Sequence, residues 1–538
     1  MKAERDFAVS IRLAKGCVAI AVALIASGAL GTAQTTSSTN GKYKIEETRL
    51  GGWFWNQLFE APAVSLDGKH VAYQDRGHCE QDVKMCIFKD GHSIDVGKDP
   101  IVYGVFLSPD GARLGYVASG AGRKGMVTTV DGQAGPSYFS IQGARFSPDG
   151  KHFAYIAEDR RGFLVVVDGK EGSTYDRVVQ MGFSPDDEVF YGAMRGKKPL
   201  IVVGEKEFGQ DWDFPFTPIF SPDGKHSAYV GCTAKMKACS VVVDGKTGPS
   251  YDAIYQNQAF FSDDGSRIWY GAKSNGKWAV VLDGTPGPTY DEVFHSSCHT
   301  TMDMGALMLG MLLPTPLAGG ELGSVFGTAC STVDFSFFSP DSKHTWYRAK
   351  KGSSWVAVED GVEGPPFANI LLDAYSPDSR HLAYTRQQSK GSNAELIEDG
   401  SKIAEAQGMS YLMFSPDSSR IAYANERYTG KQWLWAMVTD ANKGNEYRMI
   451  EFPTFSPDSK HLAYLAQTAS SPMMHTINAT DPGGSWTVVL DLQAGGEYSF
   501  VIPGTIRFGT DGDLEFLAVR KESHDNGSLF RVRYVPNQ

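Results

Sequence analysis

The stretch SPDGKHFAY, residues 147–155, carries the strongest structural signal, because variants of it recur along the whole chain. Close copies are SLDGKHVAY at 65–73, SPDGKHSAY at 221–229 and SPDSKHLAY at 456–464. Proline presets φ at the second position of a type I turn, and glycine suits the fourth. The alternating apolar residues that follow are typical of a half-buried strand. Each copy therefore predicts a tight turn leading into a strand.

The third residue of the unit is an aspartate in every copy. These aspartates are Asp67, Asp110, Asp149, Asp186, Asp223, Asp264, Asp341, Asp378, Asp417, Asp458 and Asp511. Most neighbours are 37 to 43 residues apart, but Asp264 and Asp341 are 77 apart and Asp458 and Asp511 are 53 apart. A regular period of this length indicates a repeat architecture.

Each copy has a second landmark further along, seen best as VVVDGK at 165–170 and VVVDGKTGPSYD at 241–252. Together the two landmarks predict four short strands in each unit of about 40 residues, with turn signals between them and no helical period. Four strands in about 40–45 residues form one blade of a β-propeller. The sequence therefore predicts an all-β propeller of about eleven four-stranded blades.

The unit resembles the WD40-like propeller repeat of TolB and of the propeller domains of prolyl oligopeptidase-type enzymes. The resemblance covers nearly all of residues 60–535 and implies a β-propeller fold. It implies no particular function, since propellers host many unrelated activities. The sequence differs from both families in two respects. The repeats leave no room for the α/β domain of TolB or for the hydrolase domain of the peptidases, and the chain has no GxSxG motif.

The number of rings has two alternatives. Propellers commonly have four to eight blades, so two tandem rings of five or six blades are the preferred expectation, at residues 43–297 and 331–538. The long insertion and a change of the turn from mostly SPDG to SPDS favour a break there. In the alternative, YKIEETRL at 43–50 supplies the fourth strand beside LFRVRYV at 529–535 and closes one large ring.

Residues 1–33 have a basic start, an apolar run and small residues at the end, which is the pattern of a cleaved signal peptide. A polar linker at 34–42 follows, and no later stretch is apolar enough to span a membrane. We therefore expect a periplasmic or secreted protein. The formal charge is −11, which argues against nucleic acid as a partner.

Six cysteines remain after the predicted signal, in local pairs that are expected to form disulfides in an oxidising compartment. The pairs are Cys79–Cys86, Cys232–Cys239 and Cys298–Cys330. A metal site at His295, Cys298 and His299 is the weaker alternative, because no CxxC pair exists. Neither a metal nor another cofactor is expected.

Six histidines share one position of the unit, as do the turn aspartates, and these residues are expected to be architectural. The histidines are His70, His152, His226, His344, His381 and His461. The chain contains no HExxH motif, no P-loop and no nucleophile elbow. The sequence therefore provides no candidate catalytic residue, and we favour a protein without enzymatic activity.

The residues that interrupt the repeat are the candidate binding residues. We expect the three disulfides to lie in second-to-third strand loops or a blade-to-blade loop, on one face of the array. The insertion at 298–330 and the loop around Met473 are rich in methionine, which adapts to partner surfaces. The candidates are Met302, Met304, Leu307, Met308, Met311, Leu312, Met473 and Met474. Alternatively, the insertion packs as core over a ring or between rings.

These features predict an exported binding or scaffold protein. It would recognise a protein or a cell-envelope glycan through the face that carries the disulfides. The alternative is a propeller hydrolase or lyase acting on glycans or peptides, which a cluster of non-repeated carboxylates, arginine and tyrosine at a ring centre would favour.

Overall fold

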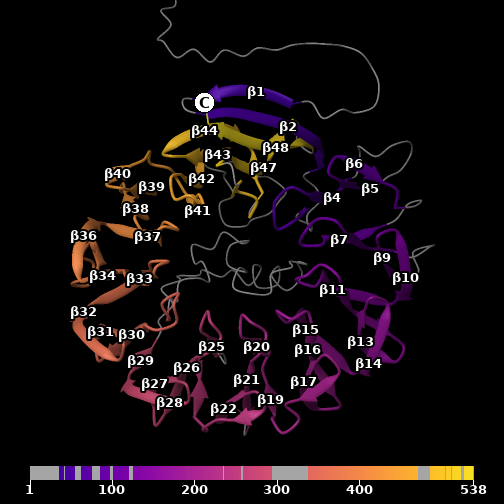
Figure 1. Cartoon of the computed structure of the whole chain (residues 1–538), viewed down its shortest axis with the longest axis horizontal. Helices are drawn as coiled ribbons and strands as arrows, with labels where there is room; N and C mark the ends of the chain where they lie inside the picture. Colours follow the sequence, from indigo (N-terminus) through magenta and orange to yellow (C-terminus); the bar gives the residue numbers. More distant parts are fainter. Residues whose placement is uncertain are drawn as a thin grey trace, which may run out of the picture.

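The computed structural model describes residues 35–40, 43–54, 62–75, 85–96, 101–119, 125–233, 236–255, 259–293, 337–469, 485–502, 504–509, 512–522 and 526–536. Within these ranges the chain forms β-strands and no α-helix, and so no helix there that could cross a membrane. The strands form eleven antiparallel sheets arranged around one centre (Figure 1). The protein is therefore an eleven-bladed β-propeller.

The first six blades follow one another along the chain. Blade 1 contains β3 (Ala63–Val64), β4 (Val71–Asp75), β5 (Cys86–Lys89) and β6 (His92–Ile94); blade 2, β7 (Val102–Leu107), β8 (Leu114–Ser119), β9 (Met126–Val130) and β10 (Gln133–Tyr138); blade 3, β11 (Ser140–Phe146), β12 (Phe153–Asp159), β13 (Gly162–Val167) and β14 (Lys170–Tyr175); blade 4, β15 (Arg177–Phe183), β16 (Val189–Arg195), β17 (Lys198–Val203) and β18 (Lys206–Phe208); blade 5, β19 (Phe214–Pro215), β20 (Ile219–Phe220), β21 (Ser227–Thr233), β22 (Ala238–Val243) and β23 (Lys246–Thr247); blade 6, β24 (Ala253–Ile254), β25 (Phe260–Phe261), β26 (Ile268–Ser274), β27 (Lys277–Leu282) and β28 (Thr285–Tyr290).

The remaining five blades complete the ring, and the last one also takes the two N-terminal strands. Blade 7 contains β29 (Glu292–Val293), β30 (Trp346–Lys351), β31 (Ser354–Glu359) and β32 (Val362–Phe367); blade 8, β33 (Asn369–Tyr375), β34 (Leu382–Gln387), β35 (Ala394–Glu398) and β36 (Ser401–Ala406); blade 9, β37 (Gly408–Phe414), β38 (Ile421–Tyr428), β39 (Trp433–Thr439) and β40 (Asn442–Lys443); blade 10, β41 (Ile450–Phe455), β42 (Leu462–Ala469), β43 (Ser485–Leu490) and β44 (Gln493–Tyr498); blade 11, β45 (Phe500–Val501), β46 (Arg507–Phe508), β47 (Leu514–Lys521), β48 (Asn526–Pro536), β2 (Tyr43–Phe54) and β1 (Thr35–Asn40).

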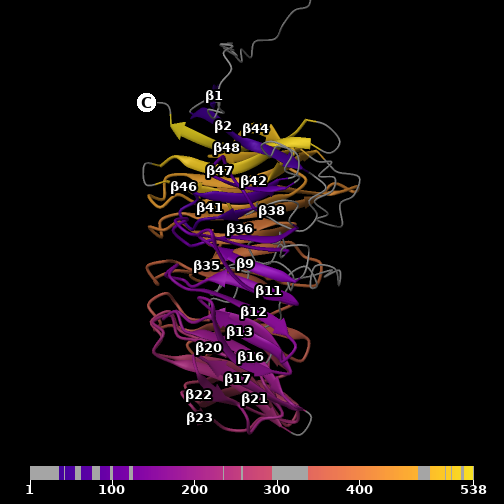
Figure 2. The ribbon, with the colours of Figure 1, turned by 90° about the vertical axis from the view of Figure 1, so that its right-hand side faces the viewer.

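The first strand of each blade lies nearest the centre, and in blades 1 to 10 the fourth lies outermost, as β11 and β14 illustrate in Figure 1. Seen from the side, successive blades stack face to face (Figure 2). Each interface is a separate apolar core. Between blades 2 and 3, for example, Phe106 of one packs with Phe153 and Tyr155 of the other. Stability therefore depends on every blade having two neighbours, which only a closed ring provides.

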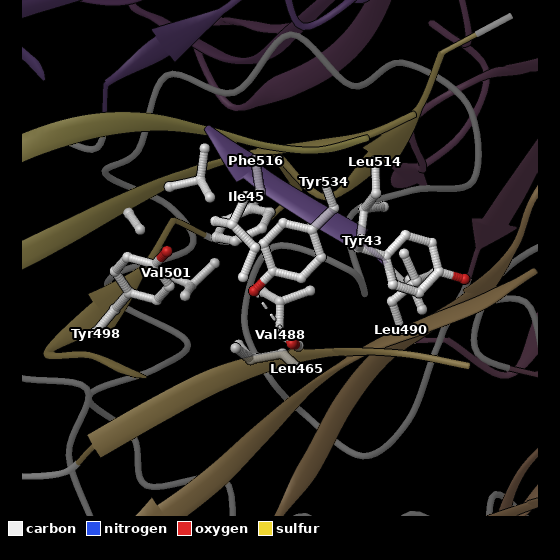
Figure 3. Close-up of a cluster of buried hydrophobic side chains, with 13 residues drawn as sticks. Tyr43, Ile45, Leu465, Val488, Leu490, Tyr498, Val501, Leu514, Phe516 and Tyr534 are labelled. Atoms are coloured by element: carbon white, nitrogen blue, oxygen red, sulfur yellow. Dashed lines mark hydrogen bonds between the residues drawn. The ribbon is translucent and has the colours of Figure 1, made fainter. Parts of the chain in front are cut away.

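Ring closure is made by the N-terminal strand. β2 pairs along its length with β48, from Tyr43 opposite Pro536 to Phe54 opposite Asn526. Tyr43 and Ile45 are 5% and 4% exposed and join the core between blades 10 and 11 (Figure 3). β2 therefore occupies the fourth-strand position of blade 11, as the single-ring alternative predicts, and β1 adds a further strand outside it.

The preferred expectation of two tandem rings is not what the structure contains, because the junction between blades 6 and 7 is continuous. Trp269 of blade 6 stacks on Phe337 of blade 7, with ring centroids 4.2 Å apart. Tyr290 at the end of β28 donates a hydrogen bond to Glu363 of β32 (2.9 Å). The proposed boundary at 298–330 thus falls inside the single ring.

Candidate functional site

The antiparallel order of the strands gives the ring two different faces. The first-to-second and third-to-fourth strand turns, such as Ser147–Gly150 and Asp168–Gly169, lie on one side, which we call the turn face. The second-to-third strand hairpins, such as 160–161 between β12 and β13, lie on the other, which we call the hairpin face. The candidate binding elements from the sequence were expected on the hairpin face.

The turn face is built from repeated hydrogen bonds. Ser147 Oγ donates to Asp149 Oδ1 (2.7 Å), and the His152 N–H donates to Ser147 Oγ (3.0 Å). Nδ1 of His152 lies 2.6 Å from Asp168 Oδ2, which ties the first turn to the second. The same histidine–aspartate pair occurs in five other blades, and Asp360 and Asp399 raise the pKa of His344 and His381 in two of them. These histidines are therefore structural, as expected.

The tyrosine–aspartate pairs at the ends of the fourth strands join one blade to the next. Tyr175 donates a hydrogen bond to Glu207 of blade 4 (3.0 Å), and the adjacent Asp176 accepts one from the Gly196 N–H in a hairpin (2.5 Å). In blade 11 the corresponding glutamate is Glu47 of β2, which accepts from Tyr498 (2.6 Å). The closing strand thus supplies the side chain as well as the backbone of a fourth strand.

The disulfide between Cys232 and Cys239 is present, with a Cα–Cα distance of 4.1 Å. The two cysteines face each other across β21 and β22 at the base of a hairpin, and both are buried in the core between blades 5 and 6. The disulfide therefore reinforces the blade at the base of its hairpin.

Most other predicted site residues lie outside the described residues. Cys86, at the start of β5, is disulfide-bonded, but Cys79 lies outside them, and so do both cysteines of the third pair. The full set outside them is Cys79, Cys298, Cys330, Met302, Met304, Leu307, Met308, Met311, Leu312, Met473 and Met474. Their partner-binding role stays a prediction.

The insertion leaves the ring at a different place from the one expected. Val293 pairs with Ala349 of β30, and Phe338 bridges Thr345 just before β30, so both flanks of residues 294–336 lie beside the second strand of blade 7. The insertion therefore interrupts the innermost strand rather than a blade-to-blade connection, because that connection has already been completed at Asp291. Its two ends lie on the inner wall of the ring.

The inner wall is irregular in most blades. The innermost strands β11, β15, β33, β37 and β41 each shift register near their middle. In several of them the bulge includes a positive φ, as at Gln180 (51°), Tyr411 (56°) and Phe452 (51°). Bulges re-aim side chains and are common near functional sites, so the inner wall is a second candidate region beside the hairpin face.

Three charged residues that the sequence analysis missed lie on or against this wall. Arg348 of β30 is 3% exposed and donates to the Ile370 carbonyl (2.6 Å) in the bulge of β33. Asp373 of β33 is 5% exposed. Burial raises the pKa of the Glu451 carboxyl on β41 to about 7. A signal existed: the other copies of the unit carry small or apolar residues at the positions of Arg348 and Asp373, except for Gln74 in the first copy.

The wall also differs around the ring. In blades 3 and 4, Gln142, Val179 and Gln180 are exposed at the bulge. In blades 8 to 10 the corresponding residues, such as Leu372 and Phe452, are half-buried. No group of three histidine, cysteine, aspartate or glutamate residues able to hold a metal occurs among the described residues. The wall therefore combines a few charged side chains with apolar surface.

Comparisons with known proteins found similar solved structures but no family for this chain. The sequence matches no family model, and no curated protein sequence matches it. Solved structures that are similar include a eukaryotic initiation factor (12% identity, 80% of this chain and 97% of that chain, TM-score 0.36) and TolB from Acinetobacter baumannii (13%, 73% and 79%, 0.21). The β-propeller domain of the Trilobed protease from Pyrococcus furiosus is another (10%, 66% and 96%, 0.26). At these values the likeness carries no argument about function.

Proposed function

We propose that the protein is an exported binding or scaffold protein that recognises a protein or cell-envelope ligand through its hairpin face. The main observation is the contrast between the faces. Nine blades repeat the same pairing of a histidine or arginine with an aspartate on the turn face, whereas the hairpins vary in length and chemistry. Variation placed on a uniform scaffold is typical of recognition surfaces.

The hairpin lengths illustrate this contrast. β12–β13, β16–β17, β26–β27 and β30–β31 are joined by two residues, whereas β34–β35 is joined by 388–393 and β38–β39 by 429–432. Blade 5 adds the buried disulfide at the base of its hairpin. Disulfides persist in oxidising compartments, which supports the export that residues 1–33 predict.

The test is capture from the native envelope fraction. Three forms would be compared: the intact protein, a variant with residues 299–329 replaced by a short Gly-Ser loop, and a turn-face control, Lys225→Glu. A partner retained by the control and lost by the folded loop variant supports recognition through the insertion. A partner lost equally with the turn-face control, or retained by the loop variant, contradicts it.

An enzymatic role is a second candidate, favoured by one observation. A carboxyl with a pKa near 7, such as Glu451, suits general acid–base chemistry. The proposal predicts turnover of an envelope glycan or peptide that Glu451→Gln abolishes in a folded protein. Unchanged turnover in that variant would reject Glu451 as the catalytic group.

A further inference from the structure

The hairpin of blade 9 differs from the others at its tip. In the two-residue hairpins the last cross-strand pair includes Asp159 opposite Gly162 and Lys351 opposite Ser354. In blade 9 the last pair is Tyr428 opposite Trp433, and β38 has eight residues against seven in β12. Two aromatic residues thus stand where these two blades carry polar or small residues.

Both aromatic side chains are exposed to solvent. Tyr428 is 45% exposed and Trp433 is 43% exposed. Their ring centroids are 5.4 Å apart, with 46° between the planes. Leaving two large aromatic rings in water forfeits the free energy that their burial would contribute. Nothing in the packing of the blade requires this, because the core of the interface is already filled by Met437 and Trp435 deeper in the hairpin.

The hairpin tip is held rigidly. The Thr429 N–H donates to the Gln432 carbonyl (2.9 Å), and the Gln432 N–H donates to Thr429 Oγ1 (3.2 Å). Gln407 Oε1 accepts from the Tyr428 N–H (2.8 Å), which fixes the tip to the preceding connection. The two rings are therefore preorganised, and binding to them costs little conformational entropy.

A carboxylate lies beside the aromatic pair. Glu426 is opposite Trp435, two residues below Tyr428, so the four side chains share one face of the hairpin. Glu426 is half-buried, and among the described residues no group donates a hydrogen bond to it. Gly408 makes room for it, since a Cβ there would lie 2.8 Å from Glu426 Oε2. The face therefore combines flat apolar rings with a free hydrogen-bond acceptor.

We infer that Tyr428, Trp433 and Glu426 form a binding site for a neutral glycan. The C–H face of a pyranose ring is apolar and stacks on aromatic rings, while its hydroxyl groups donate to a carboxylate. Two side chains expose far less than the ~800 Å² that each partner contributes to a standard protein interface. The inference deepens the proposed function, on which it rests, by naming the ligand class and its place.

The charges around the hairpin favour a neutral ligand. Arg427 is paired with Glu446 (Nε–Oε1 3.0 Å), and Lys443 also reaches Glu446 (3.1 Å). Together with Lys431 and Glu426, the hairpin region carries three basic and two acidic side chains. The net charge of the hairpin region is thus small, and it attracts neither cations nor anions strongly.

The test is calorimetric titration of the full chain with three neutral hexasaccharides: N-acetylchitohexaose, cellohexaose and maltohexaose. We expect at least one to bind, Trp433→Ala to weaken it by at least about tenfold, and Glu426→Gln by about threefold or more. Phe139→Ala is the matched control, because Phe139 is 59% exposed but lies in the connection between β10 and β11 rather than in a hairpin. Its affinity should equal that of the wild type.

Binding of none of the three sugars overturns the inference, and so does equal binding by wild type and Trp433→Ala. Concentration-dependent dimerisation that Trp433→Ala abolishes, without sugar binding, would assign the patch to contact between copies instead. These outcomes do not decide the proposed function. Its capture experiment depends on residues 299–329 and remains informative if the glycan site fails.

Discussion

Two arcs of the ring join their blades in different ways. In blades 7 to 10 the fourth turn residue is Ser342, Ser379, Ser418 or Ser459, and each serine Oγ accepts the turn N–H of the preceding blade. In blades 1 to 6 this residue is glycine, except in blade 4, where Asp187 accepts from the Asp149 N–H (2.9 Å). Wherever the fourth turn residue has a side chain that can accept a hydrogen bond, it accepts one from the turn of the preceding blade.

The difference explains the change from SPDG to SPDS without a domain boundary. All five linking residues adopt positive φ, between 62° and 65°, which glycine tolerates and other residues adopt at a cost. In blades 7 to 10, which we call the serine arc, the inter-blade hydrogen bond offsets that cost. The hydrogen bond from the Asp264 N–H to Ser342 Oγ (3.3 Å) joins blade 6 to blade 7, on either side of the long insertion in the sequence. The two arcs therefore belong to one ring, although their neighbouring turns are joined in different ways.

The largest expected effect comes from disrupting the ring closure that β2 makes in blade 11. Ile45→Asp places a carboxylate in the core between blades 10 and 11, and we expect a loss of about 3–5 kcal/mol in the free energy of unfolding. Urea denaturation measures it, and Lys44→Asp on the same strand is the control. Wild-type stability in Ile45→Asp would contradict closure by β2.

Glu451, on the inner wall of the serine arc, should make stability depend on pH. Its folded pKa of about 7 lies above its ordinary value of 4.5, so the unfolded chain releases its proton first as pH rises. Stability should therefore fall between about pH 4.5 and 7, by up to about 3 kcal/mol. Glu451→Gln should remove this fall and be more stable than wild type at pH 8.

A control for that measurement is Gln142→Glu on the inner wall of blade 3, where the side chain is exposed. This carboxyl should titrate near its ordinary value and leave the pH profile unchanged. A wild-type pH profile that Glu451→Gln does not alter would show that Glu451 ionises freely in the folded protein.

The serine links themselves should have smaller effects. Ser379→Ala loses the hydrogen bond from the Asp341 N–H but keeps the positive φ, so we expect it to cost about 1 kcal/mol. Ser379→Gly loses the same bond but relieves the backbone, so thermal unfolding should place it about 1 kcal/mol above the alanine variant. Alanine and glycine variants of equal stability would mean that the φ cost is negligible.

The smallest effect should come from moving a serine into the glycine arc. A Cβ at Gly150 would lie 3.3 Å from Pro109 Cδ, so Gly150→Ser can gain the hydrogen bond while accepting the strain. We expect a change within about 0.5 kcal/mol. Gly111→Ser should be clearly worse, because its Cβ would lie 2.4 Å from the His70 side chain. Equal effects at both positions would contradict this account.

The fold was predictable because its signal is repeated. One turn motif, seen eleven times, defined the blades, and YKIEETRL beside LFRVRYV pointed to the closing pair. Ring number was harder, since the serine at the fourth turn position acts on the neighbouring blade and only the assembled structure shows this. The change from glycine to serine at this turn position therefore favoured a domain boundary that does not exist.

The candidate sites were less predictable. Arg348 and Glu451 lie in different blades and come to the inner wall only through the ring, and a single sequence gives no spacing that joins them. Tyr428 and Trp433 were visible as residues, but their pairing depends on the register of β38 and β39. The Met-rich candidates fall outside the described residues, so their role stays a prediction.

The central claim is that all eleven blades surround one centre, and electron cryo-microscopy of the isolated protein tests it most directly. Face-on class averages should show a single ring of eleven wedges, with β2 and β48 in the same wedge. Two adjoining smaller rings of five or six wedges, meeting near residues 294–336, would contradict the account.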